Sequence, residues 1–199
     1  MTTPTGRRPD RPDPHRVEFL RHPHADFPHL SAWGIRIDGT DLRVLVAEAT
    51  RGLWALELDD GEPDEYDDTP QERDAFLLRQ HAPLHLNDDD DGAAARAHFL
   101  GDARPELRHA ESGALVLLSC SCGMDACWPL LATVTATAQT VTWSGFHQIH
   151  RPQWGELPLG PYTFARAPYE QTLAAPVHLP EDPLDPRPGS DQAGDTSRR

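Results

Sequence analysis

Long hydrophobic segments are missing from this 199-residue sequence. The longest apolar run, residues 114–118, is only five residues long, whereas a membrane-spanning helix needs about 20. The first 16 residues contain Arg, Asp and Pro but no apolar stretch like that of a secretory signal peptide. The sequence therefore predicts neither a membrane protein nor an exported one, and the expected location is the cytoplasm.

Cysteine is also scarce, and its three residues are confined to positions 120–127. An odd number of closely spaced cysteines does not build a disulfide framework. Three roles remain open for them, namely metal ligands, a reactive thiol, or small buried side chains.

Local enzyme signatures are absent as well. The sequence has no glycine-rich phosphate loop, no Gly-x-Ser-x-Gly elbow, no His-Glu-x-x-His helix and no dinucleotide fingerprint. With a net charge of −14, the chain has too little positive charge to attract the phosphate groups of a nucleic acid, so nucleic-acid binding is not expected.

The negative charge is concentrated in two runs. Residues 59–68 contain seven acidic side chains and residues 88–91 contain four, out of 32 in the chain. Blocks of like charge favour solvated loops, and this is the structure expected for both runs. The alternatives are an acidic face that captures a basic partner, as in a decoy or an immunity-type inhibitor, and a divalent cation bound at Asp88–Asp91.

Apolar residues indicate one folded domain. Residues 17–174 hold nearly all the Leu, Ile, Val and Phe, whereas residues 1–16 and 175–199 are rich in proline. We therefore expect a single domain over 17–174 between two disordered tails. The histidines between positions 15 and 29 are expected at the surface of a proline-rich loop.

Hydrophobic periodicity predicts an α+β fold with a mainly antiparallel sheet and several short helices. Residues 31–46 fit a hairpin that turns at Asp38-Gly39, although a helix starting at Leu42 fits the same residues. The other expected helices are 47–58, 70–80, 93–99 and 166–174, and the other expected strands are 114–119, 131–137, 140–146 and 161–164.

The cysteine segment is a candidate zinc site. Gly123 permits a turn that brings Cys120, Cys122 and Cys127 together. Tetrahedral zinc takes four ligands, and the preferred fourth is His150, with His147 and Asp125 as alternatives.

An aromatic and polar stretch after this segment is a candidate ligand-binding surface. Aromatic walls with an Arg fork and an amide suit a small planar or anionic ligand. The alternative is that Trp143, Phe146 and Trp154 belong to the core while Arg151 pairs with an acid. The candidate ligand-binding residues are Trp143, Gln148, His150, Arg151 and Trp154.

Two resemblances involve the same residues. The Cys-x-Cys spacing resembles part of the SWIM-type zinc motif, although Pro129 stands where that motif has its histidine. The wider pattern resembles a bacterial protein group without an assigned activity, which implies a shared fold from about residue 115 onward. The residues that match this group are Cys120, Cys122, Gly123, Cys127 to Leu130, Trp143, Phe146, His150, Arg151 and Trp154.

These observations lead to one functional hypothesis and two alternatives. The first is a non-enzymatic binding or regulatory protein in which the cysteine turn is a candidate structural zinc site. The alternatives are a thiol-dependent redox protein or Cys/His enzyme, and an acidic decoy. The expected partner is a protein or a small molecule, with neither a nucleic acid nor a membrane involved.

Overall fold

The computed structural model describes residues 13–24, 27, 29–59, 69–86, 92–101, 113–122 and 128–185. Ten strands and four α-helices lie within these residues and form an α+β fold whose pairing is mostly antiparallel, as predicted. None of the described helices is long and apolar enough to cross a bilayer. Residues 60–68 and 88–91, which hold nearly all of the two acidic runs, lie outside the described residues.

The first of two five-stranded sheets centres on an antiparallel pair, β1 and β2, in which Leu20 lies opposite Gly34. On its other side β1 is joined by the short parallel strand β10, while β3 and β5 both pair with β2. The strands of this sheet are β1 (Val17–Pro23), β2 (Ser31–Ile37), β3 (Thr40–Asp41), β5 (Leu84–His85) and β10 (Val177–His178).

The second sheet has the order β4-β6-β7-β8-β9, and all its pairings are antiparallel. Its longest hairpin, β7–β8, is rich in β-branched residues, which suit a pleated and half-buried surface. The strands are β4 (His81–Ala82), β6 (Leu115–Cys120), β7 (Leu130–Ala136), β8 (Thr140–Gln148) and β9 (Tyr162–Ala165).

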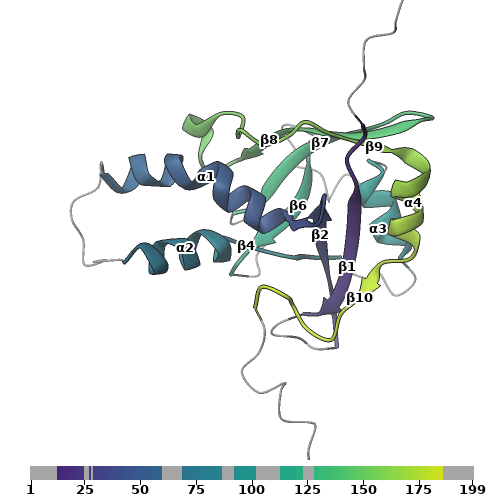
Figure 1. Cartoon of the computed structure of the whole chain (residues 1–199), viewed down its shortest axis with the longest axis horizontal. Coiled ribbons are helices and arrows are strands. Elements are labelled where there is room, and N and C mark those ends of the chain that lie inside the picture. The colour runs from purple at the N-terminus through teal and green to yellow at the C-terminus, as the bar shows by residue number, and fades with distance from the viewer. Residues whose placement is uncertain are drawn as a thin grey trace, which may run out of the picture.

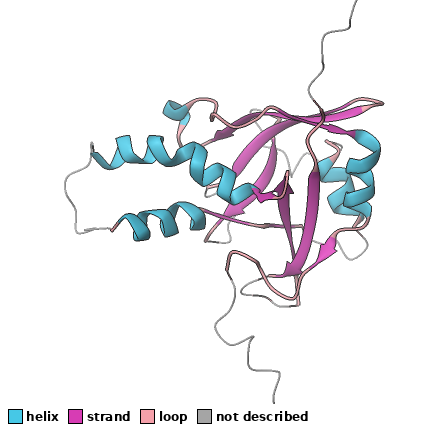
Figure 2. Cartoon of the chain, viewed as in Figure 1, coloured by secondary structure: helices cyan, strands magenta, loops and turns pink. Residues whose placement is uncertain are grey.

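Helices flank the strands on two sides, as Figure 2 shows. The pair α1 and α2 projects from one side, and α3 and α4 lie together on the other (Figure 1). A short 3₁₀ helix, Pro152–Trp154, follows β8. The α-helices are α1 (Leu42–Asp59), α2 (Pro70–Arg79), α3 (Ala93–Phe99) and α4 (Arg166–Ala174).

Aromatic rings from both sheets and from α3 and α4 meet within the core, among its aliphatic side chains. The Phe19 ring of β1 lies 4.9 Å from the Phe99 ring of α3 and 5.4 Å from the Tyr169 ring of α4. The Tyr169 hydroxyl donates a hydrogen bond of 2.6 Å to the Phe99 carbonyl oxygen. This buried hydrogen bond ties α3 to α4.

The segment after Asp38-Gly39 is a helix rather than the second strand of the predicted hairpin. The two turn residues do adopt positive φ angles, 50° and 86°, as a two-residue hairpin turn requires. The strand that follows is only two residues long, and α1 begins at Leu42. Leu42, Val46 and Thr50 are fully buried at a spacing of four, which places them on one face of the helix. The helical period therefore describes the burial of this segment, and the two-residue period of a strand does not.

The other helices and the β6–β9 strands lie within two residues of their predicted bounds. α2 begins as expected, with Thr69 and Glu72 forming a reciprocal capping box and Pro70 in the first turn. The segment around His22 differs from the prediction, because β1 runs through it and His22 is 4% exposed. The folded part also extends further than predicted, since β10 and Asp182 lie beyond residue 174.

Candidate functional site

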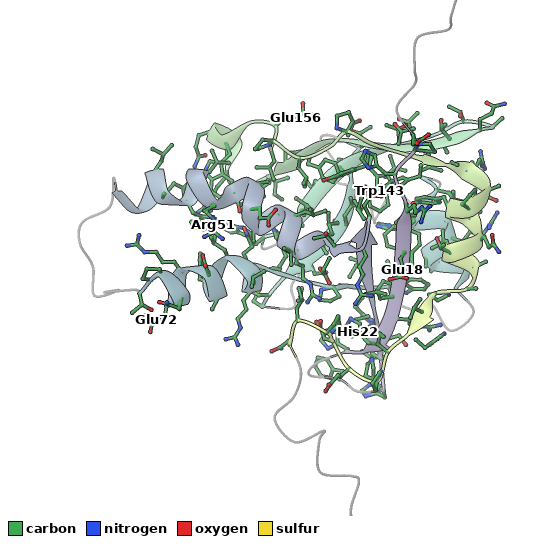
Figure 3. The ribbon with its side chains drawn as sticks, in the orientation of Figure 1. Glu18, His22, Arg51, Glu72, Trp143 and Glu156 are labelled. Carbon is green, nitrogen blue, oxygen red and sulfur yellow. The ribbon has the colours of Figure 1, made fainter. Side chains whose placement is uncertain are left out.

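The predicted ligand-binding residues separate into different parts of the fold. Trp143 is 0% exposed and lies between the two sheets (Figure 3), so it belongs to the core. Gln148 is also buried, at the end of β8, whereas His150 is exposed in the turn that follows. Only Arg151 and Trp154 remain together near the surface, and side chains from distant parts of the chain join them there.

Three tryptophans surround the Arg151 guanidinium. Its Cζ atom lies 4.2 Å from the Trp54 ring centroid, 3.9 Å from that of Trp128 and 4.9 Å from that of Trp154. The Trp54 and Trp128 rings are stacked, with centroids 5.7 Å apart and an interplanar angle of 17°. We call Trp54, Trp128, Arg151 and Trp154 the Trp–Arg cluster.

An acidic side chain, Glu57, neutralises the charge of Arg151 in the cluster. Arg151 Nε donates to Glu57 Oε2 at 2.7 Å, and Gln153 Nε2 donates to Glu57 Oε1 at 3.0 Å. Trp54 and Glu57 are three residues apart on α1, and residues at this spacing share a helix face. The arginine therefore has its flat faces available to the rings and its edge directed to a carboxylate, the arrangement that a guanidinium favours.

Hydrogen bonds and ring contacts to neighbouring elements hold the Trp54 indole in place. Its Nε1 donates to Gln80 Oε1 at 3.2 Å, and Gln80 Nε2 donates in turn to Thr50 Oγ1 at 3.0 Å. The Phe76 ring of α2 meets the Trp54 ring edge-on, with centroids 5.1 Å apart. Phe76 is 50% exposed, so the cluster continues into an apolar surface on α2.

The two described cysteines do lie together. Cys120 ends β6 and is buried, Cys122 is exposed in the next turn, and their Sγ atoms are 3.1 Å apart. Cys127 and Asp125 lie outside the described residues. Among the residues that are described, no group of three or more His, Cys, Asp or Glu side chains is arranged to hold a metal ion. His147 instead places its Nδ1 2.8 Å from the Gly145 carbonyl oxygen.

A buried histidine links the cysteine strand to β8. His81 of β4 pairs with Cys120, and its Nε2 is 2.9 Å from Gln148 Nε2. Burial lowers the pKa of His81 to about 4, although hydrogen bonds with the backbone of Ser119 and Trp128 oppose this shift. His81 is therefore neutral near pH 7, and Gln148 donates to its ring nitrogen.

A cavity of about 300 Å³ opens between the first sheet and the C-terminal segment. Its lining includes His22, Arg43, His81, Ser121 and Asp182. His22, on β1, is buried at the edge of this cavity beside the C-terminal segment (Figure 3).

The arginine of this cavity is held by two carboxylates. Arg43 Nη2 is 2.9 Å from Asp41 Oδ2 and 2.7 Å from Asp182 Oδ1. Burial alone lowers the pKa of Arg43, but the hydrogen bonds and charges of the two carboxylates raise it above its ordinary value. Burial likewise raises the pKa of Asp182, and hydrogen bonds from Arg43 bring it below its ordinary value.

Sequence reasoning missed Trp54, Trp128 and Glu57. They lie 23 to 97 residues away from Arg151 in the sequence, and only the tertiary fold brings them together. An available signal was that Trp54 and Glu57 share a helix face near the end of α1. Comparison with protein-family models, with curated proteins and with solved structures gives no match for this chain.

Proposed function

We propose that this chain is a non-enzymatic binding protein that docks a partner protein on the Trp–Arg cluster and the adjoining Phe76 surface. The observation that carries the proposal is the gathering of three of the chain's five tryptophans, each only half-buried, around one arginine.

The composition of this surface supports protein recognition. Trp and Arg are enriched among the residues that dominate binding energy at protein interfaces, because they bury large areas with few rotatable bonds. A chain with a modest apolar content would be expected to place its few tryptophans in the core. Here Trp54, Trp128 and Trp154 are only half-buried, and Phe76 is 50% exposed.

Preorganisation supports the same function. Trp54 is fixed by Gln80 and Phe76, and Arg151 is fixed by Glu57 and by the rings around it. Each rotamer-rich side chain that a partner must immobilise costs about 0.5 to 1.5 kcal/mol, so an ordered surface loses less on binding. The cluster therefore presents rigid rings to a partner.

Charge indicates the chemistry of that partner. The chain has a net charge of −14, and six acidic residues occupy positions 60–68, between the end of α1 and the start of α2. α1 also contributes Trp54 to the cluster, so the acidic segment follows the cluster closely along the chain. We expect a partner segment that inserts an aromatic or large aliphatic side chain and flanks it with Arg or Lys.

Selection of binders to the folded protein from a library of displayed linear peptides tests this proposal. Selected peptides should contain an aromatic or large aliphatic residue next to Arg or Lys, and their affinity should fall as salt concentration rises. Phe76→Asp should weaken the binding of a selected peptide at least about tenfold, equivalent to about 1.4 kcal/mol.

Phe27 supplies a matched control, because it is 53% exposed on the loop that follows β1 and no described contact joins it to the cluster. Phe27→Asp should leave the affinity unchanged, and circular dichroism should show that both variants are folded. Equal affinity of the selected peptides for both variants would contradict the proposal. If the wild type dimerises and Phe76→Asp abolishes the dimer, the partner on this surface would be a second copy of the chain and not a basic segment of another protein.

A further inference from the structure

We propose that Cys120 and Cys122 form a reversible dithiol–disulfide couple that exchanges with low-molecular-weight disulfides. The pair includes no residue of the Trp–Arg cluster, and the inference does not depend on the proposed binding function.

The two sulfurs are already in contact. Cys120 Sγ and Cys122 Sγ are 3.1 Å apart, and the backbone N–H of Cys122 donates to Cys120 Sγ at 3.5 Å. A disulfide bond is about 2.05 Å long, so its formation requires the sulfurs to approach by about 1 Å. Rotation of the Cys122 side chain provides such a movement, because Cys122 lies in a turn rather than within a paired strand.

The distance between the sulfurs can also be compared with that of two cysteines that share one zinc ion. Two sulfurs bound to one tetrahedral zinc at about 2.3 Å lie about 3.8 Å from each other. The observed 3.1 Å is shorter and corresponds to direct contact between thiols. The pair therefore lies between the two geometries, about 1 Å longer than a disulfide bond and about 0.7 Å shorter than a zinc-bound pair, so the test must distinguish the two.

The two thiols differ in accessibility, which assigns each a role. Cys122 is exposed, whereas Cys120 is 6% exposed and held in register opposite His81 of β4. An incoming disulfide can therefore reach Cys122 first, and Cys120 is positioned behind it as the resolving thiol.

Cys122 is itself exposed, so a small disulfide can reach it from solvent. Ser121, the residue between the two cysteines, lines the cavity of about 300 Å³ together with His81 and Arg79. Arg79 is exposed there and can pair with a carboxylate of small disulfides that carry carboxylates, beside the exposed Asp185 of the same cavity. Glutathione disulfide belongs to this chemical class.

The exchange proceeds in two balanced steps. The Cys122 thiolate attacks one sulfur of the small disulfide, forms a mixed disulfide and releases one thiolate. The Cys120 thiolate then attacks Cys122 Sγ, and the second small thiolate leaves with the electron pair of the broken bond. Two cysteine thiols become one disulfide, while the small disulfide gains two electrons and the two protons to become two thiols.

Incubation of the full chain with oxidised glutathione under metal-free conditions tests the couple. Intact mass should show the loss of two hydrogen atoms, and peptide mapping should locate the bond between Cys120 and Cys122. Reduced glutathione should reverse the change. Cys120→Ser should accumulate a glutathione adduct on Cys122, and Cys122→Ser should slow reaction of Cys120 at least tenfold.

Cys127→Ser is the matched control, because it removes the third cysteine and keeps the proposed pair. This variant should form the Cys120–Cys122 bond as readily as the wild type. Mapping of a disulfide to Cys127, or no bond at any glutathione ratio, would overturn the proposal. Thiols that react only after a chelator removes one equivalent of zinc would also overturn it, in favour of a metal site. Far-ultraviolet circular dichroism of each variant ensures that the comparison is made on folded protein.

Discussion

Arg43 and Asp182 are 139 residues apart in the chain and form a two-pronged ion pair in which both N···O distances are 2.7 Å. Asp41 occupies the other edge of the same guanidinium. The beginning of α1 is thereby bound to the segment that follows β10.

Loss of this ion pair should destabilise the domain. Asp182→Ala removes one carboxylate from a buried guanidinium, and we expect a loss of about 3 kcal/mol in unfolding free energy because breaking a buried pair leaves a charge under-compensated. Urea denaturation measures the change. The exposed neighbour Asp185 is the control, and Asp185→Ala should have little effect. Similar losses in both variants would contradict the assigned role.

Acidification should destabilise the fold through His81. Its pKa is lowered from 6.5 to about 4 by burial, so the unfolded chain binds a proton at a higher pH than the folded chain does. Unfolding free energy should therefore fall as pH drops below about 6.5 and level off near pH 4, with a total loss of about 3 kcal/mol from this group.

Comparison with His81→Gln isolates this contribution, because the variant has no titrating group at that position. The variant should lose less stability between pH 7 and pH 4 than the wild type. The exposed His29 is the control, and His29→Gln should preserve the wild-type pH profile. Parallel profiles for wild type and His81→Gln would show that His81 is not the titrating group. Asp182 adds to the loss at lower pH, since its lowered pKa gives stability that disappears on protonation.

Replacement of Arg151 by lysine should weaken the Trp–Arg cluster even though the charge is kept. A lysine ammonium is a compact charge and cannot lie flat against several rings at once. We expect Arg151→Lys to cost about 1 kcal/mol and to shift tryptophan fluorescence, since cation–π contacts contribute about 0.5 to 2 kcal/mol. A fluorescence-monitored urea titration measures both. Glu57→Gln, which retains the arginine, should shift the emission less.

Removal of one hydroxyl should loosen the core without leaving a large cavity. Tyr169→Phe deletes the donor to the Phe99 carbonyl, and an unsatisfied buried acceptor costs about 1 to 3 kcal/mol. Thermal unfolding measures the loss. An unchanged melting temperature would show that this hydrogen bond does not stabilise the contact between α3 and α4.

Local sequence signals predicted the helices best. Thr69, Pro70 and Glu72 specify the start of α2 by themselves, because a capping box and a first-turn proline act within four residues. Leu42 shows the opposite case. Its neighbours fit both a period of two and a period of 3.6, and only the packing of α1 against the first sheet decides between them.

Long-range contacts account for what the sequence did not predict. The segment around His22 looked like a loop because of its prolines, yet pairing with β2 makes it a strand. Trp143 and Trp154 looked equivalent, but the first lies in the core and the second beside Arg151. The burial of each tryptophan depends on which surfaces meet in the tertiary fold, and the local sequence pattern does not predict it.

The pairing of β1 with β10 has a consequence for how the nascent chain folds. β1 lies inside its sheet, between β2 and β10, yet its second neighbour is synthesised about 150 residues later. Contacts of such high sequence separation are slow to form, because loop-closure entropy is lost before any contact is gained. On the ribosome β1 is left with an open edge until residues 177–182 emerge, and this edge is where chaperones or wrongly paired strands would compete with native folding.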